Sequence, residues 1–577
     1  MRPFRLLAAT LAFSALGAAA APEVSLRWNR VGYTPDRPKS LVAMSRTDLA
    51  GQRWTIHRAD ATAARPVREG EFGPSVVGVG DHTPLPFNHT ADFGSLTEPG
   101  RYRFVFADVP PAEFRIAAAP YAELLALPLQ HLRLMRSGPD VAAPRKPSHP
   151  GDAHAPVFVP DGDPALGKWR AAEPARTVDA SSGWYDAGDQ IKFTLNIAYT
   201  TYHLLFAYHL APDLHGRPAP EQPLPPLLAE AQHGLAFLLR TFPDRDTFIL
   251  QIGDERDHEQ PERLPENDPL DGRRPALCAL SRTHMAGAAA ALALGARIFR
   301  DLGFTSEAER YAALARALHA RTLDADTLAT AFERGKVNDF YLDPTEVDQR
   351  ALAAAELFAL TGERTYLNQA VALAPPPGTE VSWGEWNWLA NLALAPHDAG
   401  ARDRLLAETS RYARHAATAG RPWSVPGRYV WGSLHRWVGA ANAARLASPL
   451  AGAAADHDAF FLAMLDYTFG RNNWGVSFVF AEGLPGGVRH IYSPAYRLLR
   501  LFPTGALSEG PGDRATHEVM ARLFAATPPD PLARFDTAAA VFRDNGDDFM
   551  CQESTIGGQA DLVLLLTLAS LPAPAAR

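Results

Sequence analysis

Residues 182–193 read SGWYDAGDQIKF, and this stretch carries the strongest chemical signal in the sequence. Two carboxylates, Asp186 and Asp189, stand three residues apart, and Gly183 and Gly188 punctuate the segment. Glycines at this density predict a turn or loop rather than a helix or strand interior. Such a pair of carboxylates belongs to a solvated turn, to a metal site or to a catalytic centre.

A loop of this kind has a definite chemical use. Two carboxylates on one side of a turn can hold a water molecule and remove its proton, which an inverting hydrolase requires of its base. The second carboxylate would orient the water and, through like-charge repulsion, raise the proton affinity of the first. A bare pair at this spacing is also typical of an Asx turn, so the pair alone does not decide between these interpretations.

The chain that precedes this loop contains a small β-rich region. Between residues 22 and 117 it has short alternating segments separated by Pro, Gly and Asp: SLRWNRVGY, SLVAMS, RWTIHRA, YRFVFADV and EFRIA. Alternating apolar and polar residues bounded by turn residues predict half-buried strands. We therefore expect a β-sandwich over residues 22–117.

From residue 120 onward the apolar spacing becomes helical. Segments with apolar residues at i, i+3, i+4 and i+7 include MAGAAAALALGARIFRDL, EAERYAALARALHARTL and VDQRALAAAELFALTG. Many helices with Ala-rich faces between long loops predict a helical toroid over residues 120–577, in which inner and outer helices alternate. The linker at residues 118–121 is too short for a flexible tether, so the sandwich should pack against the helical domain.

The overall composition is that of an ordinary globular protein. The chain has 577 residues, of which 47% are hydrophobic and 21% charged, with a formal net charge of -8. Acidic and basic residues are interspersed, so nucleic acid is not expected as a partner. A neutral or weakly charged substrate fits better, and the oligomeric state is left open.

The first residues, MRPFRLLAATLAFSALGAAAAPE, have the pattern of a secretory signal peptide. Arg2 and Arg5 precede an apolar run, and the small residues Ala18 and Ala20 suit cleavage, so residues 1–20 are predicted to be removed. The apolar run is shorter than the roughly 20 residues that a membrane span needs. We expect a secreted or periplasmic protein with no membrane span in the mature chain.

The sequence gives little sign of a metal or a disulfide framework. Its two cysteines, Cys278 and Cys551, have no spacing typical of a metal cluster, and they form one disulfide or none. No organic cofactor is expected and no metal ligand is assigned. The acidic loops are compatible with a structural calcium ion.

A second acidic segment lies near the C-terminus, where residues 542–556 read FRDNGDDFMCQESTI. It contains several carboxylates, and Glu553 is the one that lies among apolar residues. The apolar residues around it would desolvate its carboxyl group and raise its pKa.

Together the two stretches resemble the motifs of the family 9 glycoside hydrolases, secreted enzymes whose usual substrates are cellulose and related β-1,4-glucans. Residues 182–193 are similar to the signature loop of that family, and residues 542–556 to its closing motif. The resemblance implies that Asp189 is the catalytic base, that Asp186 assists with the water and that Glu553 is the general acid. It also implies an (α/α)6 catalytic domain.

Further stretches resemble the same family. They are DYTFGRNNWGVSFV at residues 466–479, QIGD followed by DH within residues 251–258, and WGS at residues 431–433. RWNRVGYTP at residues 27–35 resembles the immunoglobulin-like module that precedes one branch of the family. The resemblance therefore implies that the sandwich is an immunoglobulin-like domain.

Sugars are bound by aromatic rings that stack on their C–H faces and by polar side chains that meet their hydroxyl groups. The resemblance places histidines beside the sugar, and it places a cleft tryptophan in a Ser-Trp context like that of residues 382–383. The candidate substrate-binding residues are His258, Trp383, His490, Tyr185 and Trp431.

Two departures from the family pattern lie near the expected substrate. Ile491 stands where the family has an arginine that holds the sugar, and Gly558 stands where many members have a tyrosine. An aliphatic side chain cannot supply the donors of arginine, although Arg489 is a neighbouring candidate for that role. These changes leave the acid and base in place, so they leave the glycan and the choice between endo and exo action open.

The sequence therefore predicts a secreted, inverting glycosidase of the endo-β-1,4-glucanase type that acts on β-1,4-glucan or related β-linked oligosaccharides. Inversion would place the acid and base carboxyls about 6.5–9.5 Å apart. An exo-acting β-glucosidase or glucosaminidase of the same family is one alternative. A non-catalytic carbohydrate-binding protein and a metallohydrolase are the alternatives from other classes.

Overall fold

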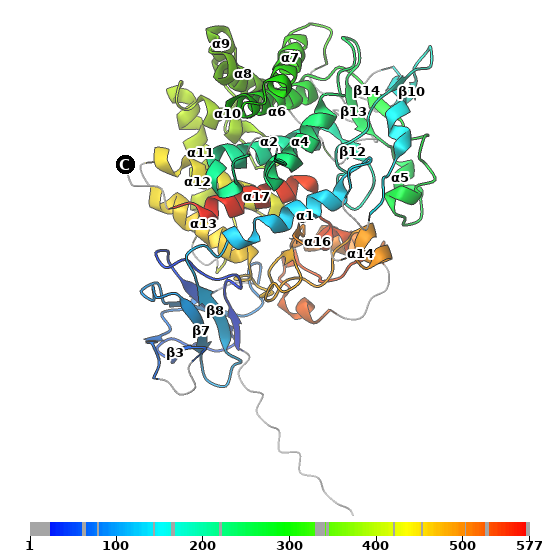
Figure 1. Cartoon of the computed structure of the whole chain (residues 1–577). Coiled ribbons are helices and arrows are strands. Elements are labelled where there is room, and N and C mark those ends of the chain that lie inside the picture. The colour runs from blue at the N-terminus through cyan, green and yellow to red at the C-terminus, as the bar shows by residue number, and fades with distance from the viewer. Residues whose placement is uncertain are drawn as a thin grey trace, which may run out of the picture.

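The computed structural model of the chain describes residues 24–60, 65–77, 80–141, 145–162, 168–218, 222–328, 341, 345–418, 422–451, 454–501, 504–524 and 530–572. The predicted signal peptide, residues 1–20, lies outside these residues. None of the helices described is both long enough and apolar enough to cross a membrane. Figure 1 shows a small β body, in blue, against a larger helical body.

The N-terminal body is a sandwich of two four-stranded antiparallel sheets, which confirms the predicted β-sandwich. One sheet has the order β1 (Val24–Arg27), β2 (Ser40–Ser45), β6 (Phe87–Asp92) and β5 (Val76–Val77). The other has the order β4 (Arg68–Glu71), β3 (Arg53–Arg58), β7 (Gly100–Val105) and β8 (Ala112–Ile116). Strands β4, β5 and β6 are not among the predicted segments.

Alternating side chains fill the space between the two sheets. In β3, Trp54 and Ile56 are buried while Arg53 is exposed, as the two-residue period of a strand requires. Trp54 stacks on Phe104 of β7 with ring centroids 5.2 Å apart, a contact that adds to the burial of apolar area. The sandwich therefore has a hydrophobic core of its own.

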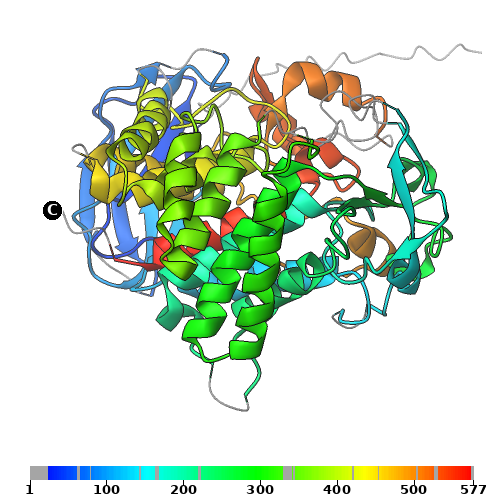
Figure 2. The ribbon, with the colours of Figure 1, turned by 90° about the horizontal axis from the view of Figure 1, so that it is seen from above.

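The larger body consists of two alternating rings of helices. The inner ring contains α2 (Thr194–Leu210), α6 (Arg282–Asp301), α8 (Val347–Thr361), α10 (Asn387–Leu394), α12 (Ser433–Ala447) and α17 (Ile556–Ser570). The outer ring contains α1 (Ala126–Met135), α4 (Pro226–Leu238), α7 (Thr305–Arg321), α9 (Arg364–Leu373), α11 (Ala399–Ala416) and α13 (Ala454–Thr468). Neighbouring inner helices contact one another, and α17 contacts α2, which closes the ring. The predicted (α/α)6 toroid is confirmed, and Figure 2 shows several of its helices, in green, side by side.

Burial distinguishes the two rings. Every residue of α17 except Ser570 is buried, whereas α11 of the outer ring buries one face that includes Leu405 and Tyr412. A helix that is enclosed on all sides is apolar all round, and a surface helix is amphipathic. The inner helices therefore form the core of the helical body, and the outer helices shield them from solvent.

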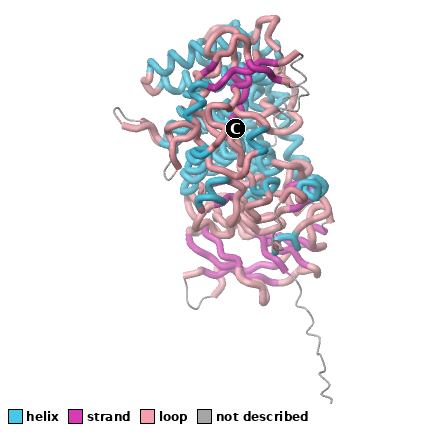
Figure 3. The backbone as a smooth tube through the Cα atoms, turned by 90° about the vertical axis from the view of Figure 1, so that its right-hand side faces the viewer, coloured by secondary structure: helices cyan, strands magenta, loops and turns pink. Residues whose placement is uncertain are grey.

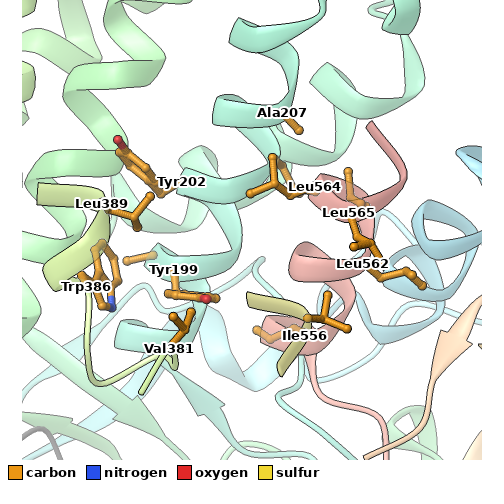
Figure 4. Packing of buried hydrophobic residues seen from close by; sticks show 14 of the residues in the cluster. Tyr199, Tyr202, Ala207, Val381, Trp386, Leu389, Ile556, Leu562, Leu564 and Leu565 are labelled. Atoms are coloured by element: carbon orange, nitrogen blue, oxygen red, sulfur yellow. The ribbon is translucent and has the colours of Figure 1, made fainter. Parts of the chain in front are cut away.

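Helices α2 and α17 meet at the centre of this core. Figure 4 shows Tyr199 and Tyr202 of α2 beside Trp386, which directly precedes α10, with side chains of α17 across the same space. The Tyr199 hydroxyl donates to Asp561 Oδ1 of α17 at 3.1 Å. A buried hydrogen bond to a charged group fixes the relative position of these two helices more strongly than apolar contacts alone.

A small sheet that was not predicted supports the loop at residues 182–191. Its order is β10 (Trp169–Ala171), β9 (Ala155–Pro160), β14 (Ala276–Cys278), β13 (Ile249–Ile252) and β12 (Lys192–Phe193), and β11 (Thr177–Val178) pairs with β9. Figure 3 shows the strands in magenta gathered in two separate regions, with helices between them. Strand β12 follows the loop directly and leads into α2, so the loop lies at the start of an inner helix.

Short elements connect these layers. They are the helices α3 (Pro212–His215), α5 (Arg256–Glu259), α14 (Pro494–Leu499), α15 (Arg514–Met520) and α16 (Phe549–Gln552), and the strands β15 (Val479–Phe480), β16 (Ala506–Leu507), β17 (Gly512–Asp513) and β18 (Ala540–Val541).

The sandwich packs directly on the helical body, as the short linker predicts. Asn29 Nδ2 donates to Asp466 Oδ1 at 2.9 Å and to the Tyr121 hydroxyl oxygen at 2.8 Å. Arg27 Nε donates to the carbonyl oxygen of Asn473 at 2.7 Å. These side chains are buried, and their polar groups find partners across the interface. Directional bonds of this kind give the sandwich a fixed orientation on the helices.

Candidate active site

The loop at residues 182–191 is closed by its own hydrogen bonds. Ser182 and Gly183 adopt left-handed conformations, with φ of 72° and 76°. The Asp186 N–H donates to Ile191 O at 3.0 Å, and Lys192 Nζ donates back to Ser182 O at 3.1 Å. The loop that carries both carboxylates is therefore fixed at its two ends.

Asp186 is the buried member of the pair, with 1% of its surface exposed. Asn196 Nδ2 donates to its Oδ1 at 2.6 Å, and the Tyr341 hydroxyl donates to its Oδ2. Burial, reinforced by the charge of Asp189, raises the pKa of Asp186 to about 8. Burial therefore favours the protonated form of Asp186, and its position is fixed by two side-chain donors.

Asp189 is the more accessible member, with 17% of its side chain exposed. Its Oδ1 accepts the Ile191 N–H at 2.8 Å, which turns the carboxylate back over the loop. Its Oδ2 lies 3.5 Å from His258 Nε2. The hydrogen bond to Asp189 raises the pKa of His258 to about 9, so a cationic imidazole faces this carboxylate at neutral pH.

Glu553 reaches the same loop from the opposite end of the chain. It follows α16, and its Oε1 accepts the Gly188 N–H at 2.9 Å across a separation of 365 residues. Burial, with the charge of Asp189 as the next cause, raises the pKa of Glu553 to about 8. The structure thus brings Asp186, Asp189 and Glu553 together, and it gives Glu553 the raised pKa that an acid needs near neutrality.

Gly188 is required where the loop meets Glu553. A Cβ atom at this position would lie 2.4 Å from the Tyr492 ring and 2.8 Å from Glu553 Oε1. Both distances are too short for real contacts, so a side chain here would displace Glu553 or the ring. The glycine allows the backbone N–H to approach the carboxylate closely.

Two neighbouring segments hold Glu553 on either side. The Tyr492 N–H donates to Gln552 O at 3.0 Å, and the Glu509 N–H donates to Glu553 O at 2.9 Å. Glu509 is itself a buried carboxylate, and burial raises its pKa. The acid candidate therefore sits between an aromatic residue on one side and another carboxylate on the other.

The side chain of Tyr341 lies between Trp383 and Asp186. The Trp383 ring meets that of Tyr341 edge to face, with centroids 4.9 Å apart, and Tyr341 donates to Asp186. On another side Trp383 stacks on His435 at 5.4 Å with an interplanar angle of 9°. Trp383 is partly exposed, so it can present a ring face to a ligand beside the carboxylates.

His490 and Trp431 lie at the edges of this arrangement. His490 has 46% of its side chain exposed, and its Nδ1 lies 3.4 Å from Asp544 Oδ1, a hydrogen bond that raises its pKa. Trp431 is partly exposed and packs against Phe549 of α16 with ring centroids 5.5 Å apart. Trp431 thus contacts the short helix that precedes Glu553.

Tyr185 does not lie where a sugar could stack, so its assignment as a substrate-binding residue is wrong. It is 2% exposed, and its hydroxyl oxygen lies 2.8 Å from Ser148 Oγ and 2.6 Å from His149 Nδ1. Its ring packs behind the loop and supports it. The tryptophans with buried side chains are Trp28, Trp54, Trp184, Trp386, Trp388, Trp423, Trp437 and Trp474.

The residue that departs from the family pattern at position 491 is buried in this structure. Ile491 is fully buried, so it presents no group to a substrate. Arg489 is exposed, and its N–H and that of His490 donate to Asp544. These two backbone bonds order the segment that carries His490.

One group of potential metal ligands stands out in the part of the chain that the structure describes. His517, Asp548 and Cys551 have ligand atoms within 4.8 Å of one another. They already satisfy one another, because His517 Nε2 lies 2.7 Å from Asp548 Oδ2 and Asp548 Oδ1 accepts the Cys551 N–H at 3.0 Å. A set with histidine and cysteine does not suit calcium, which prefers oxygen ligands. Cys278 and Cys551 are both free and buried, so they do not pair.

Residues at this site that sequence analysis missed include Tyr341 and Glu509. The Tyr341 hydroxyl donates to Asp186, and the Glu509 N–H donates to Glu553 O. Neither has a spacing to either carboxylate motif that a sequence pattern could use. Only the folded positions of these segments place the two side chains at the site.

Comparison with known protein families agrees with this arrangement. Residues 121–566 match the family model "Glycosyl hydrolase family 9", and residues 21–110 match the model "Cellulase N-terminal ig-like domain". The two matched regions correspond to the helical body and the sandwich, respectively.

Curated relatives extend the comparison. The chain is 28% identical over 545 residues to "Endoglucanase C" of Cellulomonas fimi, which covers 85% of this chain and 47% of that protein. It is 26% identical over 388 residues to "Xyloglucan-specific endo-beta-1,4-glucanase BoGH9A" of Bacteroides ovatus, which covers 63% of this chain and 62% of that protein. The chain thus spans about half the length of the first relative and less than two thirds of the second.

Solved structures show the same architecture. A metagenome-derived glycoside hydrolase family 9 endoglucanase superposes with a TM-score of 0.77 at 25% identity, over 95% of this chain and 99% of that one. A structure described as AaCel9A in complex with cellobiose-like isofagomine has a TM-score of 0.73 at 21% identity, over 94% and 99% of the two chains, and shares the fold. With the family model matched across the whole helical body and the carboxylates of both motifs gathered in one site, the chain belongs to glycosyl hydrolase family 9.

Proposed function

We propose that this protein is an inverting glycoside hydrolase that cleaves β-1,4-glucan or a related β-linked oligo- or polysaccharide. The observation that carries the proposal is the hydrogen bond between Glu553 and the Gly188 N–H, which holds the partly buried acid against the loop of Asp186 and Asp189. Family membership and the printed activities of the relatives, endoglucanases in both cases, support the substrate class.

In the proposed reaction, a water molecule attacks the anomeric carbon from one face of the sugar. Asp189 takes a proton from this water as the water oxygen bonds to carbon, and Glu553 gives its proton to the departing glycosidic oxygen. Asp186 orients the water. Because attack and departure occur on opposite faces, a β-linked substrate yields a product with an α-anomeric hydroxyl.

The division of roles between the two aspartates follows from their surroundings. Burial favours the protonated form of Asp186 and raises its pKa to about 8, so it is a poor base. Asp189 is more exposed and faces the cationic His258. Pairs of carboxyl groups in such different environments are typical of acid–base catalysis.

Trp383, Trp431, His258 and His490 are the proposed substrate contacts. Trp383 has the strongest support, because it is partly exposed and lies next to Tyr341, which binds Asp186. His258 would contact the substrate beside the base. His490 and Trp431 would bind sugar units farther along the chain of the glycan.

The rate is expected to depend on pH through Glu553. Its pKa is raised to about 8, and it must be protonated to act as the acid, so kcat/KM should fall as the pH rises through about 8. The pKa of Asp186 is also about 8, so this limb reports the coupled pair rather than one residue. The measurement is kcat/KM for a soluble cello-oligosaccharide between pH 5 and 10. A profile with its basic limb near the ordinary pKa of a glutamate would contradict the assignment.

Product analysis tests the proposed function directly. We expect nuclear magnetic resonance spectra, recorded before mutarotation, to show α-anomeric product from a panel of cello-oligosaccharides, mixed-linkage glucan, xylan and chitosan oligomers. Product lengths separate endo action from the exo-acting β-glucosidase or glucosaminidase alternative. Tight binding without turnover would support a non-catalytic carbohydrate-binding protein, and loss of turnover with a chelator would support a metallohydrolase.

The remaining features are proposed on the sequence alone. Residues 1–20 would direct the chain to the periplasm or the medium, residues 22–117 would form the immunoglobulin-like domain, and residues 120–577 the catalytic domain. The proposed chemistry uses no organic cofactor. A structural calcium ion is compatible with the acidic loops, and a rise in Tm on addition of calcium would support it.

A further inference from the structure

Glu509 occupies a defined place beside the acid candidate. The Glu509 N–H donates to Glu553 O at 2.9 Å, and the Gly510 N–H donates to Cys551 O at 3.1 Å. The segment that contains Glu509 therefore runs alongside the one that carries Glu553. The Tyr492 N–H donates to the neighbouring carbonyl oxygen, Gln552 O. The segments that contain Glu509 and Tyr492 therefore flank the Glu553 segment on opposite sides.

The Glu509 side chain reaches the start of α12. A Cβ atom at Gly432 would lie 2.8 Å from Glu509 Oε2, so the carboxylate is seated against bare backbone there. Its side-chain hydrogen bond is to Thr555, two residues after Glu553. Glu509 is 6% exposed, so it is largely shielded from bulk water.

Glu509 shares its basic neighbours with other carboxylates. The two basic side chains that interact electrostatically with it are those of His435 and Arg436. His435 Nδ1 lies 2.7 Å from Asp561 Oδ2, and Arg436 pairs with Glu380. Burial of a carboxylate that shares its basic partners is costly, and carboxyl groups with perturbed pKa values gather at functional sites.

The residues that approach Glu509 also hold Trp383. The His435 ring stacks on Trp383 at 5.4 Å, and Arg436 Cζ lies 5.4 Å from the Trp383 ring centroid. Trp383 is partly exposed, and its ring contacts Tyr341, whose hydroxyl donates to Asp186. An exposed ring beside an acceptor for hydrogen bonds is the combination that binds a sugar ring and its polar substituents.

We propose that Glu509 is a further substrate-binding residue, whose carboxylate accepts hydrogen bonds from a pyranose unit that lies against Trp383 beside the bond to be cleaved. The inference rests on the proposed glycosidase function of the site. The donors are hydroxyl groups in a glucan, or an ammonium group together with hydroxyl groups in an amino sugar. Both present the same chemistry to the carboxylate, and the test distinguishes them.

The test measures binding in protein that cannot turn the ligand over. Affinities of a cello-oligosaccharide and a chitosan oligomer are determined by calorimetry for Glu553→Gln, with and without Glu509→Gln. We expect the second substitution to weaken binding of at least one ligand by about 10- to 100-fold, since it removes a charged acceptor. A larger loss for the chitosan oligomer identifies the ammonium donor, and equal losses identify hydroxyl donors.

A matched control separates contact from stability. Glu356 of α8 is another buried carboxylate, bonded to Tyr202 and paired with Arg297 away from the site. Glu356→Gln in the same background should leave both affinities unchanged. If Glu509→Gln does not fold, Glu509→Asp keeps the charge but shortens its reach, and it is expected to weaken binding as well.

Three results would overturn the inference: unchanged affinity for both ligands, equal losses in the Glu356 control, or no measurable binding of either ligand to the Glu553→Gln parent. The proposed function fails separately. If protein with Glu553 intact hydrolyses nothing, while binding depends on Glu509, then the glycosidase assignment is wrong and the role of Glu509 as a ligand contact stands.

Discussion

Glu553→Gln is expected to reduce kcat on unactivated β-glucans by about 10²–10⁴-fold while it leaves ligand affinity largely unchanged. The amide has the shape of the carboxyl group but has no acidic proton for the leaving oxygen. The measurement is kcat on a cello-oligosaccharide, compared with a substrate whose dinitrophenolate leaving group needs no proton. The kcat on the activated substrate should fall much less, because cleavage of its bond needs no acid.

Equal losses on both substrates would contradict the acid role and indicate a general disruption of the site. Glu356→Gln serves as the control, since it removes a buried carboxylate elsewhere in the helical core. It should retain kcat on both substrates, provided that the folded fraction is the same.

The same Glu553 variant is expected to be more stable than the parent at pH 8. The pKa of Glu553 is raised from 4.5 to about 8 in the folded state, so folding favours the protonated form. Its contribution to stability is fully present below about pH 4.5 and is lost as the pH rises toward 8. Glutamine does not titrate, so the gain in Tm of the variant should appear between these pH values and grow with pH. A constant difference in Tm from pH 4 to pH 9 would argue against a buried acid.

Asp189→Ala is expected to lower kcat by about 10²–10⁴-fold, since no group then removes the proton from the attacking water. Sodium azide is a nucleophile that needs no base, so it should restore part of the rate. The azide product from a β-linked substrate should have the α configuration, because the attack comes from the face opposite to the leaving group. The configuration of that product is read by nuclear magnetic resonance.

A β-configured azide would contradict inversion. If the variant keeps normal activity and azide does not increase it, the base role of Asp189 is wrong. Asp179→Asn is the matched control. Asp179 lies earlier in the same part of the chain, is about half exposed and pairs with Arg240. Its substitution should leave kcat unchanged.

The amphipathic and Ala-rich helices, including the inner helices α6 and α8, could be predicted from the sequence, but the inner helix α2 could not. Helix α11 shows a helical period of apolar residues because one face is buried and the other is exposed to solvent. Helix α2 is buried on nearly every side, and polar residues such as Asn196, Tyr199 and Tyr202 bind partners inside the protein, so its sequence has no solvent-facing polar side. Inner helices of this kind are specified by their neighbours rather than by their own pattern.

In the candidate site, too, some residues could be predicted from the sequence and others could not. Asp186, Asp189 and Glu553 could be identified because each stands in a long motif, and the structure places them together. Tyr185 belongs to the same motif, yet it supports the loop from behind, because a motif records structural residues as well as chemical ones. Glu509 belongs to no motif, and its position depends on a hydrogen bond between segments that are remote from the first loop.

The contact that closes the inner ring also has a consequence for how the protein folds. Tyr199 and Asp561 join helices that are 362 residues apart in the chain, and Glu553 precedes the second of these helices by three residues. Contacts of such long range are slow to form, because the entropy of a large loop must be lost before they contribute to stability. The acid and the base should therefore meet late in folding, after most of the helices have packed. A chain stalled before this step would have most of its secondary structure and no complete catalytic centre.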